Sequence, residues 1–304
     1  MKKFKTLILI ILGLVLSFGA VSFIYGAQWE GKNNFNLAFW LNQNGGIISL
    51  QPQNQQAVIV VFPPETILPV AKGFGDYRAK AVYALGEQEK LGGGYLWQLS
   101  VERFLGLMTD GYLINLKPRQ TLKKSLLVNG VFLSLFKPGE LASLDALRAW
   151  WFLIRLRPDQ LEIINLVDSG VAVEKRLANG DLAYEATEEK IDQLLRRFFV
   201  ETTAANQNLR LLVFNATDQL GAGSWFSRVL NNHGGLVVHI TNAPPSEHSV
   251  VEATQEPFFD KFLVEKTIKK FNFDTKVVNS IFQGRGDVGY ILAEDFKQKY
   301  FVND

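Results

Sequence analysis

The chain has 304 residues, with 32 basic and 30 acidic side chains and a formal net charge of +2 at neutral pH. This balance excludes a nucleic-acid partner, because nucleic-acid binding needs a dense basic face. The absence of cysteine excludes disulfides, thiolate zinc sites and cysteine nucleophiles. With 47% apolar residues, the chain is able to bury a sizeable core.

Residues 6–25 form an apolar run without a charged side chain, directly after a tail that carries three lysines. About 20 apolar residues are enough for an α-helix to cross a bilayer, and basic residues favour the cytoplasmic side. Residues 1–27 are therefore predicted as a cytoplasmic tail and a single transmembrane anchor, which places the bulk of the chain outside the cytoplasm at the cell membrane. A cleaved signal peptide is the alternative, but Tyr25 stands where a cut after Ala27 requires a small residue.

Residues 28–200 predict an α/β domain. Alternating or Val- and Ile-rich runs indicate strands, and apolar residues at near-helical spacing indicate helices. The predicted strands are 35–40, 47–50, 57–62, 112–116 and 161–166, and the predicted helices are 76–85, 95–107, 140–157 and 188–200. Gly45 and Gly46 are expected to form a turn between the first two strands.

Residues 201–208 (ETTAANQN) are small and polar, and they predict a linker. A second unit follows over 209–304, in which strands and helices alternate. The predicted strands are 209–215, 236–240, 275–279 and 288–292, the predicted helices are 221–232 and 258–271, and 242–257 is expected to be a loop. This alternation implies crossover connections and a sheet that is covered by helices.

Four stretches of the second unit carry a family resemblance. They are 209–217 (LRLLVFNAT), 221–230, 235–238 (GLVV) and 287–296 (DVGYILAEDF). In order and spacing they resemble the small C-terminal domain of the LytR-CpsA-Psr family of cell-envelope proteins.

The first unit resembles a diverged form of that family's main domain. Residues 61–66 (VFPPET) correspond to the family's Ile-Pro-Arg-Asp-Thr strand end, and 78–83 (RAKAVY) to its Lys-Ile-Asn-Ala-Ala-Tyr helix. A glycine turn at 92–94 and an Asp-x-Tyr strand start at 110–112 follow in the family order. The predicted fold class is α/β: a transmembrane helix, a diverged LytR-CpsA-Psr-like domain, and a small C-terminal domain of alternating strands and helices.

The resemblance implies transfer of a glycopolymer from a polyprenyl-pyrophosphate carrier to peptidoglycan, with arginines, magnesium-binding carboxylates and an apolar lipid tunnel. This chain departs from that pattern, because Pro64 replaces the family's arginine and no Arg-rich segment follows residue 110 as the family requires. The charged candidates for catalysis that remain are Glu65, Arg78, Lys80 and Arg103. We therefore expect a non-catalytic protein that binds wall polymer, polyprenyl-linked lipid or envelope proteins. The alternative is a diverged phosphotransferase, and magnesium is expected only in that case.

Two further clusters have simpler interpretations. One is a short span that contains His239, Glu247, His248 and Glu252, but His248 and Glu252 lie in the predicted loop, so no metal site and no cofactor are predicted. The aromatic run 150–152 (WWF) could stack on sugar rings, but its helical spacing next to leucines predicts core packing.

Overall fold

The computed structural model describes residues 27, 29–41, 44–115, 124–135 and 141–302. The predicted transmembrane anchor of residues 1–27 lies outside these residues, apart from Ala27. Among the helices that are described, none has the length and apolar composition needed to cross a bilayer. We refer to residues 29–200 as the first unit and to residues 209–302 as the second unit.

A five-stranded sheet in the order β6-β1-β2-β3-β7 organises the described part of the first unit. Strand β2 is antiparallel to both neighbours, whereas β6 is parallel to β1 and β7 is parallel to β3. The strands are β1 (Phe35–Leu41), β2 (Asn44–Gln51), β3 (Gln56–Phe62), β6 (Gly111–Asn115) and β7 (Leu161–Asn165). The hairpins beside it are β4 (Ile67–Val70) with β5 (Gly75–Arg78), and β8 (Ala172–Arg176) with β9 (Leu182–Ala186).

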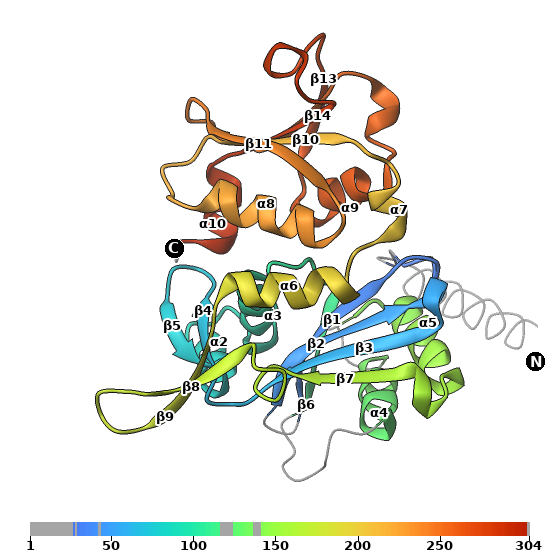
Figure 1. Ribbon diagram of the computed structural model, residues 1–304, viewed down its shortest axis with the longest axis vertical. Coiled ribbons are helices and arrows are strands. Elements are labelled where there is room, and N and C mark those ends of the chain that lie inside the picture. Colours follow the sequence, from blue (N-terminus) through green and yellow to red (C-terminus); the bar gives the residue numbers. More distant parts are fainter. Residues whose placement is uncertain (1–26, 28, 42–43, 116–123, 136–140, 303–304) are drawn as a thin grey trace, which may run out of the picture.

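Helices cover both faces of this sheet (Figure 1). Successive strand residues point to opposite faces, and they divide the buried side chains into two clusters. One face packs against α2 (Ala79–Gln88), α3 (Gly93–Leu105) and α6 (Glu188–Phe198). The other face packs against α4 (Lys124–Ser134) and α5 (Ser143–Arg155).

The second unit contains a five-stranded sheet of described strands in the order β11-β10-β14-β12-β13. Its strands are β10 (Arg210–Asn215), β11 (Leu236–Asn242), β12 (Val250–Ala253), β13 (Asp274–Val277) and β14 (Val288–Leu292). Its helices are α8 (Ala222–Asn232), α9 (Phe262–Phe271) and α10 (Glu294–Tyr300), and α7 (Thr202–Ala205) precedes it. Figure 1 shows α8, α9 and α10 on the face that looks toward the first unit. Short 3-10 helices are η1 (Pro52–Asn54), η2 (Pro158–Gln160), η3 (Glu256–Phe258) and η4 (Phe282–Gly284).

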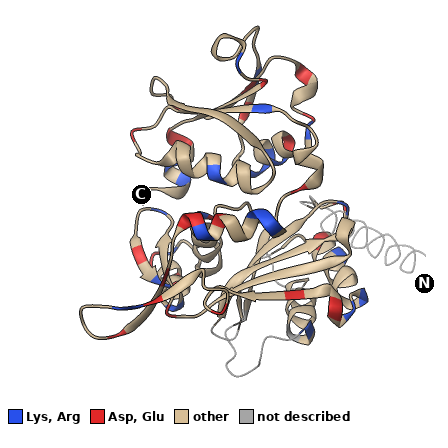
Figure 2. Ribbon diagram, viewed as in Figure 1, with Lys and Arg blue, Asp and Glu red and all other residues tan. Residues whose placement is uncertain are grey.

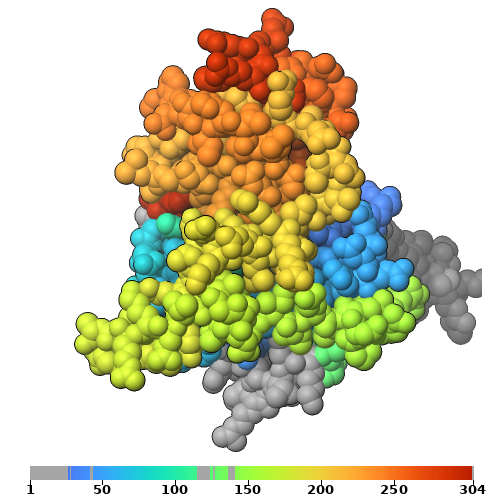
Figure 3. Space-filling model, viewed as in Figure 1, coloured from blue at the N-terminus to red at the C-terminus, as the bar shows by residue number. Residues whose placement is uncertain are grey.

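The two units share a hydrophobic core. A single buried cluster continues from the α3 face of the first sheet to the aromatic side chains of α8, α9 and α10. The Trp225 indole on α8 donates a hydrogen bond to the carbonyl oxygen of Arg103 at 3.1 Å and lies 4.7 Å from the Tyr300 ring. The space-filling view shows the units in direct contact along this face (Figure 3).

The glycine pair at 45–46 is not a turn, and that prediction is wrong. Both residues lie inside β2 and pair with β3. A side chain on Gly45 would collide with the Trp97 ring, and one on Gly46 would collide with the Val60 carbonyl oxygen. The pair is therefore required by close packing against α3 and β3. In the sequence, glycines that allow such packing look the same as glycines that form a turn.

Other predicted boundaries also need correction. The predicted helix 76–85 begins only at Ala79, because residues 75–78 pair with β4 as strand β5. The predicted loop 242–257 contains β12, which is held between β14 and β13. In both places tertiary pairing decides the backbone conformation, so local sequence preference is a poor guide.

Candidate functional site

The stretch that resembles the family motif follows β3 and turns directly into the β4–β5 hairpin. The backbone N–H of Ala79 donates to the Thr66 carbonyl oxygen at 2.8 Å, and that of Lys80 to the Pro64 carbonyl oxygen at 3.0 Å. These bonds fix the start of α2 against the motif. They bring together two of the candidate residues, since the Lys80 ammonium lies 3.6 Å from the Glu65 carboxylate.

The other two candidates are engaged elsewhere. The Arg78 guanidinium donates to the Asp181 carboxylate, 2.7 Å away in the turn between β8 and β9, and thereby holds the pKa of Asp181 below its usual value. Arg103 donates to the Val70 carbonyl oxygen at 3.0 Å and stacks over the Phe301 ring. The structure thus places Glu65, Lys80 and Arg78 around the start of α2, and Arg103 at the contact between the units.

A polar pocket of ≈ 400 Å³ lies between the units, where α9 faces the amino ends of β1 and β6. Its lining combines ammonium, carboxylate, amide and hydroxyl groups with two aromatic side chains. The lining residues are Trp29, Glu30, Asn33, Asn34, Thr109, Asp110, Phe262, Glu265, Lys266, Lys269 and Lys270. Glu65, Arg78, Lys80 and Arg103 are not among them.

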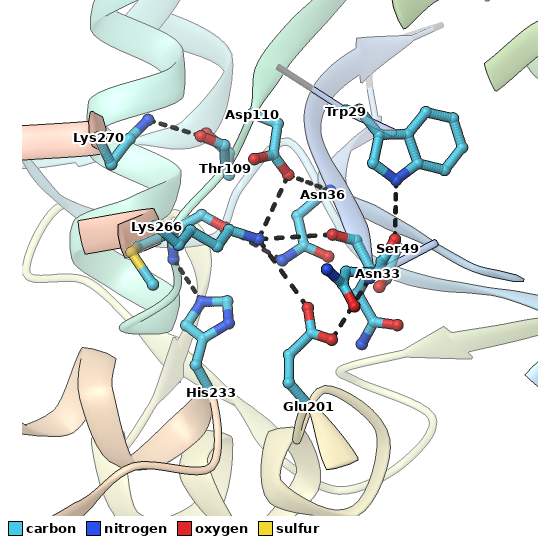
Figure 4. Close-up of polar contacts among 12 residues, drawn as sticks. Trp29, Asn33, Asn36, Ser49, Thr109, Asp110, Glu201, His233, Lys266 and Lys270 are labelled. Atoms are coloured by element: carbon cyan, nitrogen blue, oxygen red, sulfur yellow. Dashed lines mark hydrogen bonds and ion pairs between the residues drawn. The ribbon is translucent and has the colours of Figure 1, made fainter. Parts of the chain in front are cut away.

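Lys266 is the central cation of this pocket. Its ammonium lies 3.7 Å from the Asp110 carboxylate and 3.9 Å from the Glu201 carboxylate, and donates to the Asn34 carbonyl oxygen at 3.4 Å (Figure 4). Asp110 also accepts the backbone N–H of Asn36 at 2.7 Å. Three segments far apart in sequence therefore meet at one side chain.

Glu201 lies within the predicted linker, yet it is only 2% exposed. Burial raises its pKa to about 7, against the opposing effect of Lys266 and of the hydrogen bond from the Asn34 backbone. A carboxyl group with this pKa exchanges its proton near neutrality.

Glu102 of α3 is buried and contacts two of the lining residues, Thr109 and Lys270. Its carboxylate accepts hydrogen bonds from the Thr109 hydroxyl at 2.6 Å and the Tyr300 hydroxyl at 2.8 Å, and lies 2.5 Å from the Lys270 ammonium. Burial opposes its ionisation, but Lys270 and Thr109 outweigh that effect and lower its pKa. The group therefore stays ionised and joins α3 to α9 and α10.

His233 follows α8 and is fully buried. Its Nε2 accepts the backbone N–H of Met108 at 2.9 Å, so the ring is neutral with its proton on Nδ1. Burial, and then the charges of Lys266 and Lys270, hold its pKa well below 6.5. The imidazole therefore serves as a neutral hydrogen-bond acceptor between the units.

The pocket is balanced in charge. Its three lysines face three acids, and on the described ribbon as a whole basic and acidic segments are interspersed (Figure 2). Ammonium and amide groups donate hydrogen bonds, whereas carboxylate and amide oxygens accept them. A surface of this kind suits a ligand with many hydroxyl groups better than a polyanion, which would meet the carboxylates.

The sequence did not indicate this pocket. Its residues come from the segment before β1, the residues before β6, and α9. Among them only Asp110, in the Asp-x-Tyr strand start at 110–112, belongs to a motif that the sequence shows. The one local signal was Glu201, the charged residue that begins the otherwise small and uncharged polar stretch 201–208.

Comparison with known proteins gives structural neighbours only. No family model matches the chain, and no curated protein matches it. TagT from B. subtilis superposes at 13% identity and a TM-score of 0.40, covering 57% of this chain and 92% of that one. TagV from B. subtilis gives 10% identity and a TM-score of 0.39, covering 55% of this chain and 95% of that one.

A third neighbour is the LytR-CPS2A-psr family protein YwtF (TagT) with bound octaprenyl pyrophosphate lipid. It superposes at 12% identity and a TM-score of 0.38, covering 57% of this chain and 91% of that one. The chain resembles solved proteins of the LytR-CPS2A-psr family. This is the family that the sequence motifs predict, although at these identities and TM-scores the likeness assigns no activity.

Proposed function

We propose that this protein is a single-pass, membrane-anchored protein of the cell envelope that binds the glycan of a wall polymer in the pocket between its two units, without transferring it. The observation that carries the proposal is the pocket itself: ≈ 400 Å³, charge-balanced and rich in both donors and acceptors. This volume lies in the usual range for small-ligand sites.

The hydrogen-bonding groups favour sugar hydroxyls. Asn33, Asn34 and Thr109 offer neutral donors and acceptors, and the exposed Lys269–Glu265 pair at 2.5 Å places one charge of each sign at the rim. A hydroxyl group donates and accepts at once, so it is satisfied by both kinds of partner. A phosphodiester group lacks this match, because it is an anion with acceptors only and would meet the pocket's carboxylates.

The charges near the motif support binding over transfer. Lys80 lies beside Glu65, and Arg78 is committed to Asp181. Phosphoryl transfer depends on several cations fixed around the phosphates, and Pro64 supplies none. One structural neighbour was solved with octaprenyl pyrophosphate, so a lipid-linked substrate is the alternative to be tested.

The binding test uses the full chain in lipid nanodiscs, titrated calorimetrically with soluble disaccharide fragments of peptidoglycan. We expect saturable binding that weakens roughly tenfold, about 1.4 kcal/mol, when Lys269→Ala and Glu265→Ala are combined. The matched control combines Lys175→Ala and Glu185→Ala, another exposed pair at 2.5 Å that lies outside the pocket. The control is expected to bind like the unchanged protein.

The same preparation tests the alternative. Polyprenyl pyrophosphate with magnesium is titrated against the protein and against the Arg78→Ala and Lys80→Ala variants. Saturable binding that these variants lose, together with no glycan binding, would overturn the proposal and support a phosphotransferase.

A further inference from the structure

A stripe of apolar side chains on α5 faces outward. Leu147, Trp151 and Ile154 recur at helical spacing and are 37%, 48% and 36% exposed. The opposite face of α5 packs into the core beneath the sheet. On the neighbouring α4, Phe132 is also exposed, and its ring lies 5.7 Å from that of Trp150. The α4–α5 pair thus presents one continuous apolar surface. The prediction that the aromatic run 150–152 is core is wrong for Trp151, because its side chain is 48% exposed.

The chemistry of this surface matches the boundary between lipid and water. The Arg155 guanidinium lies 4.0 Å from the centre of the Trp151 ring. Arg157, two residues later, is largely exposed and pairs with Asp159 at 3.2 Å. Tryptophan is enriched at membrane interfaces because its ring is apolar and its N–H polar. Arginine extends its charged end to the headgroups while its stem covers apolar surface.

The start of the folded chain is fastened to α5. The backbone N–H of Trp29 donates to the Asp145 carboxylate at 3.1 Å, and the Arg148 guanidinium donates to the Trp29 carbonyl oxygen. The Trp29 ring meets the Phe152 ring edge-on at 6.5 Å. The apolar run ends at Tyr25, only four residues earlier. Four extended residues reach at most ~14 Å, so a membrane anchor over 6–25 holds the amino end of α5 within that distance of the bilayer.

We propose that the exposed α4–α5 surface rests on the outer interface of the bilayer that holds the anchor, with Leu147, Trp151 and Ile154 among the lipid headgroups. The proposal rests on the anchored topology of the proposed function, and it adds a second contact that fixes the orientation of the folded part. The pocket shares Trp29 with this attachment, so docking holds the pocket close to the membrane surface.

The test exploits the absence of cysteine. Leu147→Cys and Val277→Cys are each labelled with an environment-sensitive fluorophore, and the full chain is reconstituted in liposomes that contain a nitroxide-labelled lipid. Val277 is an exposed apolar residue on β13, at the far end of the second unit (Figure 1). We expect quenching at position 147 to exceed that at position 277 at least about fivefold.

A second variant separates lipid contact from unfolding. Ile154→Asp, added to the Leu147→Cys chain, is expected to remove most of that quenching while the circular dichroism stays unchanged. Equal quenching at positions 147 and 277 in chains retained by the liposomes would overturn the docking proposal alone. If alkaline extraction releases the chains from the liposomes, the membrane anchor on which the docking proposal rests is wrong. Glycan binding, the other part of the proposed function, is measured in a separate experiment.

Discussion

Glu102→Ala is expected to lower the free energy of unfolding by about 3–5 kcal/mol, the cost of removing one partner of a buried ion pair. Glu102 is 1% exposed, and its carboxylate holds Lys270, Thr109 and Tyr300 at once. Its removal leaves the Lys270 ammonium, which is 18% exposed, without its carboxylate. Urea denaturation of the full chain in detergent micelles, followed by tryptophan fluorescence, measures the effect.

Glu185→Ala is the matched control for this experiment. Glu185 also lies 2.5 Å from a lysine, Lys175, but both side chains are exposed on the β8–β9 hairpin. Exposed pairs contribute at most about 1 kcal/mol. If both variants lose the same small amount of stability, the contact between α3, α9 and α10 does not hold the units together as described.

Glu201→Gln is expected to change the pH dependence of stability. In the native chain the pKa of Glu201 is raised from 4.5 to about 7 by burial. The stability that Glu201 contributes by holding its proton in the folded state is therefore fully present below pH 4.5, and it is lost as the pH rises through 7. Relative to Glu201→Gln, the unchanged protein should gain about 1.4 kcal/mol per pH unit on acidification across this window, or about 3 kcal/mol in all.

His233 acts in the opposite direction. Its native pKa lies well below 6.5, so the unfolded chain takes up a proton below pH 6.5 that the native chain refuses. Stability is therefore lost on acidification, and in the unchanged protein this loss offsets the gain from Glu201 between pH 4.5 and 6.5. Denaturation at several pH values should show a profile for the unchanged protein that lies between those of the two variants over that window. It should show a fall toward acid for Glu201→Gln and a rise toward acid for His233→Asn. Parallel profiles for all three proteins would contradict these assignments.

The sequence predicted the elements that local pattern determines. The Val- and Ile-rich run at 57–62 is strand β3, and the predicted strand 288–292 is β14 to the residue. The missed elements depend on distant partners. Residues 250–253 form β12 only because β14 and β13 lie on either side, and the glycines at 45–46 are needed for their contact with Trp97 and Val60.

The pocket escaped prediction for a related reason. The Lys266 ammonium meets Asn34, Asp110 and Glu201, which lie 232, 156 and 65 residues earlier in the chain. No spacing rule connects residues so far apart. The resemblance to a family did direct attention to Glu65, Arg78 and Lys80, and the structure places these three around the start of α2.

The location of bound glycan tests the central claim most directly. The full chain in nanodiscs is irradiated with a peptidoglycan disaccharide that carries a diazirine, and the cross-linked peptides are identified by mass spectrometry. We predict cross-links in the segments 29–34, 109–110 and 262–270, which line the pocket, and their loss in the combined Lys269→Ala and Glu265→Ala variant. Cross-links confined to residues 61–80, beside the family motif, would contradict the account.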